Sequence, residues 1–229
     1  MGYNWQWYQI PRYFYRVIDE ELIWGPLATG LVITIEISLY SMLLTLALGL
    51  LTALLRMSNS LSGQVLARVY LETIRNTPML VQIYVFYFVI APVVGIDRFW
   101  TGVLCLGLFE GSFASEIIRA GINSVPRGQW EAASSVGLSR FASYRYVVLP
   151  QAIPLMLPPM TGVLINLIKH SSIVSVIAVF ELTTEGRNII ADTYMAFEVW
   201  LTVAGIYLVL TVSLSIFVGY LERRLRQPT

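Results

Sequence analysis

The chain has 229 residues, of which 56% are hydrophobic and 13% are charged, and its formal net charge is +1. A water-soluble domain of this length could not bury so large an apolar fraction, so the composition excludes that class and predicts a membrane protein. The sequence has no basic tract with interleaved aromatic residues, which argues against a nucleic-acid-binding protein.

Residues 1–26 precede the first long apolar run and are rich in aromatic side chains. Because amphipathic rings settle at the depth of the lipid headgroups, we expect an interfacial segment on the outer, periplasmic surface. A sixth membrane crossing is the alternative, but the charges within 19–21 make it costly. The aromatic residues that support the interfacial position are Trp5, Trp7, Tyr8, Tyr13, Phe14 and Tyr15.

Five later segments approach or exceed the roughly 20 helical residues that cross a bilayer. The expected fold class is therefore all-α and polytopic, with about five transmembrane helices in one domain over residues 27–222. Within it, Gly107 and Gly111 form a small-residue face suited to close helix contact. The expected spans are 27–55, 66–90, 99–118, 152–179 and 200–221.

Basic residues favour one orientation of these spans. With the amino terminus outside and the carboxyl terminus inside, ten arginines lie in the cytoplasm or at its boundary and four lie outside, in keeping with the excess of positive charge in cytoplasmic loops. Residues 223–229 then form a cytoplasmic tail. The ten are Arg56, Arg68, Arg75, Arg119, Arg127, Arg140, Arg145, Arg223, Arg224 and Arg226, and the four are Arg12, Arg16, Arg98 and Arg187.

Prolines interrupt two of the expected spans. Pro78 lies in the second span, and Pro154, Pro158 and Pro159 lie in the fourth. Each proline ring removes a backbone donor and disturbs the preceding turn, so we expect bent helices at both places. Irregular backbone at membrane depth is tolerated only where it is buried in protein or faces a wet cavity.

The loop between the third and fourth spans, residues 126–150, predicts a short cytoplasmic helix. Its small residues would admit a close partner backbone, and a tryptophan would supply an anchor, so the helix suits a groove on another protein. A helix that rests on the lipid surface is the alternative. The proposed contact face contains Trp130, Ala133, Gly137 and Phe141, with Glu131 and Arg140 on neighbouring faces.

This loop resembles the membrane subunits of ATP-binding-cassette (ABC) importers. Their cytoplasmic motif is Glu-Ala-Ala, three residues, Gly, nine residues, Ile, one residue and Leu-Pro, and this chain departs from it only by Val147 in place of Ile. The resemblance implies a type I importer with a MetI-like fold, in which this coupling helix docks into a cleft of the ATPase subunit. The matching residues are Glu131, Ala132, Ala133, Gly137, Leu149 and Pro150.

The resemblance extends over most of the chain and narrows to permeases for polar amino acids. It is carried by the segments 75–82, 116–122, 125–129 and 169–172. His170 stands where the family often has Asp or Asn. Glutamate and aspartate are the first substrates that the resemblance implies, with basic or neutral polar amino acids as alternatives. An ion-driven secondary transporter is the alternative of another class, but no inverted repeat or filter motif is visible.

Ionisable residues inside the spans give a separate pointer to a solute pathway. An amino-acid zwitterion needs both signs of charge, so Lys169 with the hydroxyls of Ser171 and Ser172 could receive a carboxylate. Glu110 could receive an ammonium group. His170 completes the candidate pathway set, and as the only histidine it has no clustered metal ligands.

Structural pairing is the competing explanation for such residues, because an unpaired charge inside a membrane is costly. For Lys169 and Glu110 both explanations stay open. Glu116 is better explained by a pair with Arg119 one turn away, and Glu36 by bonding within the helix bundle.

The sequence has no GxxxxGK[ST] phosphate loop, no HExxH motif and no GxSxG motif. We therefore expect a transport subunit that is not an enzyme and carries no cofactor or metal, while ATP and Mg are used by a partner. The implied partners are two ATPase subunits, a second permease that is either a copy or a related chain, a periplasmic solute-binding protein and the lipid bilayer. The expected location is the bacterial inner membrane.

Overall fold

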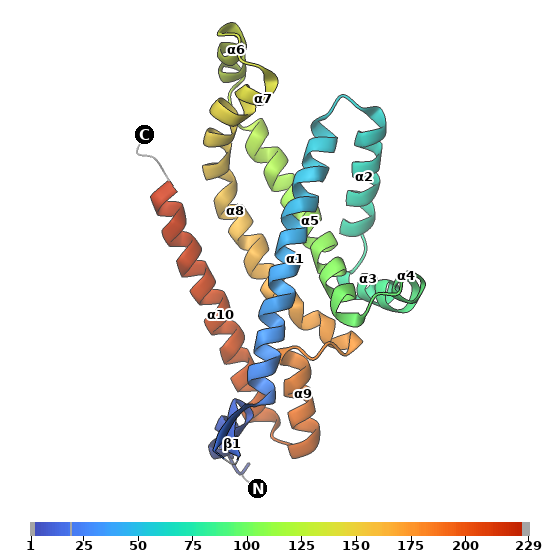
Figure 1. The fold of residues 1–229 in the computed structure, drawn as a ribbon, viewed down its shortest axis with the longest axis vertical. Helices are drawn as coiled ribbons and strands as arrows, with labels where there is room; N and C mark the ends of the chain where they lie inside the picture. Colours follow the sequence, from blue (N-terminus) through green and yellow to red (C-terminus); the bar gives the residue numbers. More distant parts are fainter. Residues whose placement is uncertain (1–2, 19, 226–229) are drawn as a thin grey trace. The chain divides into compact units, whose positions relative to one another are not determined.

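The computed structural model describes residues 3–18 and 20–225 of the chain. Its elements are helices apart from one β-hairpin near the amino terminus (Figure 1), which confirms the all-α class. Two compact units are described separately below. Unit 1 comprises Met1–Met42, Pro78–Leu106 and Asn166–Ser213, and unit 2 comprises Leu43–Thr77, Gly107–Ile165 and Leu214–Thr229.

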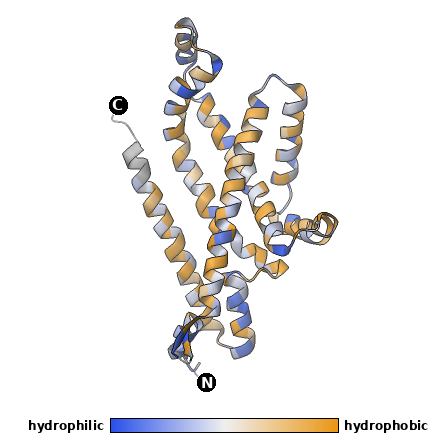
Figure 2. Cartoon of the chain, in the orientation of Figure 1, coloured by the Kyte–Doolittle hydropathy of each residue, from blue (hydrophilic) through white to orange (hydrophobic). Residues whose placement is uncertain are grey.

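Four helical stretches are long and apolar enough to cross a membrane, and a broken pair of helices supplies a fifth. In Figure 2 hydrophobic residues run along these long helices, whereas α9 (Leu182–Thr193) is largely hydrophilic. The expectation of five spans is confirmed. Three of the four long stretches are the single helices α1 (Pro26–Met57), α5 (Arg98–Asn123) and α10 (Ala196–Leu225). The fourth runs from α7 (Arg140–Ser143) through η3 (Tyr144–Val148) and α8 (Leu149–His170) to η4 (Ser171–Ile177). The broken pair joins α2 (Leu61–Arg75) to the run of α3 (Met79–Val85), η2 (Phe86–Ile90) and α4 (Ala91–Val94).

The amino-terminal segment folds as η1 (Trp7–Tyr13) and a hairpin of β1 (Tyr15–Ile18) and β2 (Glu21–Trp24). Strands of four residues are far too short to cross a bilayer. The alternative of a sixth membrane crossing is therefore wrong. The carboxylate of Glu198 in α10 accepts hydrogen bonds from the Tyr3 hydroxyl at 2.5 Å and the Gln6 backbone N–H at 2.7 Å. These bonds fix the segment to the start of α10.

The core of unit 1 brings this segment together with the carboxyl-terminal part of the chain. Aliphatic and aromatic side chains from η1, α1, α9 (Leu182–Thr193) and α10 pack in one cluster. The sequence reading missed α9, which is too short and too polar to register as a span. The cluster consists of Ile10, Tyr13, Leu27, Leu182, Ile189, Met195, Val199 and Val203.

The prolines act differently in the two spans. The second span breaks as expected, since α2 ends at Arg75 and α3 begins at Met79, directly after Pro78. The fourth does not break at its prolines, because α8 continues through all three and changes to the 3-10 helix η4 only at Ser171. The physical reason is a buried stripe on α8, whose packing outweighs the lost backbone donors. That stripe contains Ala152, Met156 and Val163.

In unit 2 the helices α1 and α5 approach each other closely at glycine. A Cβ atom added to Gly107 would lie 2.6 Å from Cδ2 of Leu44, and one added to Gly111 would lie 3.2 Å from Cβ of Leu48. The small-residue face expected at these two positions is therefore confirmed as a close helix contact.

Candidate functional site

The coupling loop lies in unit 2 and contains α6 (Arg127–Ser135), followed by α7. The helix ends because Gly137 adopts a left-handed conformation with φ of 77°. Its N–H donates to the carbonyl of Ser134 at 3.0 Å, and the N–H of Leu138 donates to the carbonyl of Ala133 at 3.1 Å. This is the Schellman arrangement, so Gly137 terminates the helix instead of extending its contact face.

The face of α6 that was expected to meet a partner instead meets its own chain. Ala133 is 4% exposed, and the half-buried Trp130 packs edge-on against Tyr144 at 5.0 Å between ring centroids. Phe141 cannot share this face, because the helix ends at Ser135 and Phe141 lies on α7. Trp130 therefore gives part of its surface to its own chain, and its contact with a partner stays a prediction.

A different set of side chains in this loop faces outward. Glu131, Ala132 and Arg140 are exposed. Three large side chains that follow α6 are also exposed, and the sequence reading missed the first and last of them as contact candidates. They are Val136, Phe141 and Tyr146, with 75%, 78% and 71% of their surface accessible. Exposed apolar side chains grouped in one loop are candidates for a protein contact surface.

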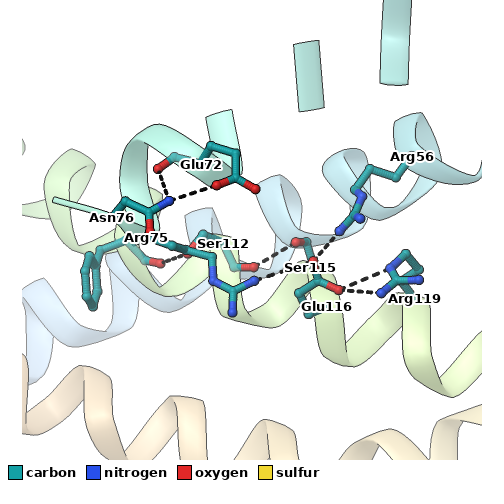
Figure 3. Close-up of polar contacts among 9 residues, drawn as sticks. Arg56, Glu72, Arg75, Asn76, Ser112, Ser115, Glu116 and Arg119 are labelled. Carbon is teal, nitrogen blue, oxygen red and sulfur yellow. Dashed lines mark hydrogen bonds and ion pairs between the residues drawn. The ribbon is translucent and has the colours of Figure 1, made fainter. Parts of the chain in front are cut away.

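A charge cluster surrounds Glu116 on α5 (Figure 3). Its carboxylate accepts hydrogen bonds from Arg56 and from Arg119, the latter at 2.8 Å and 3.1 Å, and Arg75 lies 3.5 Å away. The pair with Arg119 confirms the sequence prediction. Arg56 and Arg75 were missed, because they come from α1 and α2 and no local spacing reveals such a contact.

The Glu116 cluster borders a cavity of about 380 Å³ in unit 2. The guanidinium of Arg75 also lies 5.2 Å from the ring centroid of Phe113, a cation–π contact that holds it in place. One carboxylate thus orders three arginines from three helices. The other residues that line the cavity are Arg68, Leu71, Glu72 and Asn76.

The candidate pathway residues lie where α8 changes into η4. Lys169 is exposed and Ser171 is buried. The Ser171 hydroxyl donates to the carbonyl of Ile168 and the Ser172 hydroxyl donates to that of Lys169, both at 2.7 Å. The hydroxyls therefore donate to backbone carbonyls one turn back in this structure, and their contact with a substrate carboxylate stays a prediction.

Glu110 and Glu36, two further acidic residues of the spans, lie in different surroundings. Glu110 is 2% exposed and belongs to unit 2, whereas Lys169 and its neighbours belong to unit 1. A joint zwitterion site made by Lys169 and Glu110 stays a prediction. Glu36 is exposed on α1 and makes no ion pair or hydrogen bond with any residue that the structure describes, so its expected bonding within this chain was wrong.

Comparison with known proteins identifies the class of molecule that these features serve. Residues 45–227 match the family described as "Binding-protein-dependent transport system inner membrane component". The chain belongs to this family. It is therefore a multi-pass permease of an ABC importer, and partner ATPases hydrolyse the ATP.

Two relatives and one solved structure show which ABC importers the chain is similar to. The permease is 41% identical over 182 residues to a probable glutamine ABC transporter permease of Bacillus subtilis, covering 79% of this chain and 84% of that one. It is 37% identical to the L-cystine transport system permease of the same organism, covering 90% and 89%. The solved structure of an amino acid ABC transporter crystallised with histidines has a TM-score of 0.79 at 37% identity, covering 87% and 94%. These similarities confirm the type I importer fold and the polar amino acid permease family.

The permease also contains a buried carboxylate that the sequence reading did not single out. Glu181 precedes α9, and its two oxygens accept hydrogen bonds from the backbone N–H groups of Thr183 and Thr184, both at 2.8 Å. The Tyr207 hydroxyl donates to it at 2.9 Å. Glu181 thus caps α9 and joins it to α10, and burial raises the pKa of its carboxyl group above the ordinary value.

The residues that the structure describes include no group of three His, Cys, Asp or Glu side chains placed to hold a metal ion. His170 in particular lies at the end of α8 beside serines. Its position in the permease is that of a helix-terminal residue.

Proposed function

We propose that this permease imports neutral polar amino acids, with glutamine as the first candidate. The relatives named above are described as permeases for glutamine and for cystine, both of which carry no net side-chain charge. Glutamate and aspartate, the first substrates that the sequence resemblance implies, find no support among these relatives. Basic amino acids remain the second alternative, because Glu110 lies in a span and is buried.

In this proposal a periplasmic binding protein delivers the amino acid, and two ATPase subunits supply the energy with ATP and Mg. A second permease subunit closes the pathway, since a five-span subunit provides one half of it. The amino terminus faces outward in the inner membrane and the carboxyl terminus faces the cytoplasm, as the distribution of arginine favours. The tail at 223–229 lies partly outside the described residues, and α10 extends to Leu225.

The two faces of the coupling loop have different contacts. Trp130 holds α6 against the permease, because it packs on the core that contains Val148 and Ala152, and Ala133 is buried on the same helix. The outward residues contact the ATPase. These are Glu131, Ala132, Val136, Arg140 and Phe141, and their support is the family motif together with their exposure.

Within the membrane, the region of η4 is the candidate substrate contact. The helix changes type at Ser171 within a span, and such irregular backbone is found where a transporter binds its solute. Ser171 and Ser172 then shape the turn, while Lys169 and His170 supply side chains. Glu110 remains the candidate for the ammonium group.

Uptake into vesicles tests the substrate. The permease is reconstituted with its ATPase and binding protein, and uptake of labelled glutamine is measured with a hundredfold excess of glutamate, arginine or cystine. Strong uptake of glutamine that excess glutamate leaves intact supports the proposal. Inhibition by glutamate or aspartate alone would restore the acidic assignment, and uptake without ATPase subunits would favour an ion-driven transporter.

A further inference from the structure

The second half of α2 and the residues that follow it expose a series of polar side chains, although α2 belongs to a membrane span. The first half exposes apolar side chains, among them Leu61 and Val65. Ionisable side chains inside a span are costly in contact with lipid, so they pair with one another or face water. This part of α2 is therefore suited to an aqueous passage. The exposed polar residues are Arg68, Glu72, Thr73, Arg75, Asn76 and Thr77.

The cavity of about 380 Å³ that the Glu116 cluster borders lies along this polar surface. All of its lining residues belong to unit 2, so their relative positions are defined. Cavities that bind small molecules have volumes of roughly 300–1,000 Å³. The cavity is therefore large enough for an amino acid.

Two arginines of the cavity keep donors for a further anion. Arg68 makes no ion pair or hydrogen bond with any residue in the ranges 3–18 and 20–225. Arg75 approaches the Glu116 carboxylate only to 3.5 Å, and its cation–π contact with Phe113 holds the guanidinium without using an N–H group. A guanidinium has five N–H donors and binds a carboxylate through two parallel hydrogen bonds. Arg68 and Arg75 together therefore offer a site for a carboxylate.

Glu72 supplies the opposite charge in the same cavity. The Asn76 side-chain amide donates hydrogen bonds to the backbone carbonyl of Glu72 and to Oε2 of its carboxylate, both at 2.8 Å (Figure 3). The other carboxylate oxygen, Oε1, accepts no hydrogen bond from any residue that the structure describes. Arg68 and Glu72 lie one turn apart on α2 and still form no ion pair with each other. Both charges are therefore open to a ligand that carries both signs.

We propose that this cavity is a second amino-acid site of the permease, in which Arg68 and Arg75 bind the α-carboxylate and Glu72 binds the α-ammonium group. The inference rests on the proposed function and deepens it. In the proposed orientation α2 begins on the cytoplasmic side, so the site holds the amino acid on its way out of the membrane. It contains no residue of the η4 region. It contacts only the groups that all α-amino acids share, so it does not select among their side chains.

A lipid headgroup is the less suitable occupant of the cavity. A phospholipid needs an apolar surface for its acyl chains on the membrane side of the headgroup. On α2 this surface instead carries Thr73, Asn76 and Thr77, up to the break at Pro78. A free amino acid has no such requirement.

Protection of a cysteine beside the cavity tests the site. Cys105, the only cysteine, is replaced by serine, and Thr73→Cys is introduced at an exposed position next to Glu72. The permease–ATPase complex, without binding protein, is treated in inside-out vesicles with a membrane-impermeant maleimide. Glutamine at about ten times its Kd should slow the alkylation about tenfold, because only the empty site reacts. Leu61→Cys, exposed on α2 outside the cavity lining, is the control and should react equally with and without glutamine.

Analogues of glutamine test whether both charges are needed. N-acetylglutamine lacks the ammonium group, glutaminamide lacks the α-carboxylate, and inorganic phosphate supplies a negative charge alone. None of the three should protect Thr73→Cys. Protection by phosphate or N-acetylglutamine that equals protection by glutamine would show a simple anion site and overturn the inference.

Side-chain variants assign the protection to this cavity. Arg68→Gln should raise the glutamine concentration for half protection about tenfold, because a charge-assisted contact is lost. Arg68 has no partner within the described ranges, so this change leaves the Glu116 cluster intact. Arg127→Gln, at an exposed arginine outside the cavity, and Lys169→Ala in the η4 region should both keep the protection. Protection that survives Arg68→Gln and is lost in Lys169→Ala would overturn the inference, since it would report a distant conformational effect.

Glutamine uptake by the unmodified complex separates this site from the proposed function. Uptake without protection of Thr73→Cys overturns the inference alone. Protection without uptake overturns the proposed function and supports the site, and the absence of both overturns both.

Discussion

At the residue scale, two carboxylates are each satisfied by several donors, some of which come from distant parts of the sequence. Glu116 orders arginines from α1, α2 and α5, and Glu181 collects two backbone N–H groups and the Tyr207 hydroxyl. A buried carboxylate is tolerable only when such donors satisfy it. Removing the carboxylate therefore leaves several polar groups unpaired at once.

Glu181→Ala should lower the free energy of unfolding by about 2–4 kcal/mol, since it leaves the N–H groups of Thr183 and Thr184 without acceptors in a buried site. Thermal denaturation in lipid nanodiscs measures the effect. Tyr207→Phe removes one donor and should cost about 1 kcal/mol. Equal stability of Glu181→Ala and the unmodified permease would show that the network contributes nothing.

The stability of the permease should also depend on pH through Glu181. Burial raises the pKa of its carboxyl group above the ordinary 4.5, so the folded state binds the proton more tightly than the unfolded state. The associated stability is fully present below pH 4.5 and is lost as the pH rises through the folded pKa. Glu181→Gln should remove this dependence in melting curves, and an unchanged slope would contradict the assignment.

At the scale of the element, the coupling helix is defined by how it ends. Gly137 supplies the left-handed residue that closes α6, and Trp130 packs the helix against the core of unit 2. The residues of the loop that do not pack against this core form its outward surface. A helix with the same sequence turned by half a turn would present a different surface to the ATPase.

Gly137→Leu should abolish ATP-driven uptake while membrane insertion stays intact. A leucine at φ of 77° costs roughly 1–2 kcal/mol, which shifts the end of α6 and the residues after it. Gly137→Asn is the matched control, because asparagine tolerates the left-handed region. Uptake and protein level in the membrane are measured together, and near-normal uptake by Gly137→Leu would contradict the role of this turn.

Phe141→Ala and Trp130→Ala should distinguish a residue that contacts the ATPase from a residue that stabilises the fold of the permease. Phe141 is 78% exposed, so its loss should weaken ATPase binding with a change in unfolding free energy below about 0.5 kcal/mol. Trp130 packs against Tyr144, so its loss should destabilise the permease by about 2 kcal/mol. Pull-down of the ATPase and thermal denaturation distinguish them. If Phe141→Ala binds the ATPase normally, the outward surface has been assigned wrongly.

At the scale of the whole molecule, five spans give a subunit that needs partners. The exposed coupling loop and the uncovered carboxylate on α1 are both features that a lone chain would not keep in a membrane.

The purified complex should contain two ATPase subunits and two permeases, because each permease carries one coupling helix. Native mass spectrometry of the complex from membranes measures this composition. A single permease that transports without an ATPase would refute the assembly.

The sequence by itself determined the spans, the break at Pro78 and the family, because apolar length, proline chemistry and motif spacing are local properties. The tertiary structure decided which side of α6 faces outward, that α8 continues through its prolines, and which arginines surround Glu116. Each of these depends on packing between residues far apart in the chain. Arg56 and Glu116 are separated by 60 positions, and only the folded chain brings them into contact.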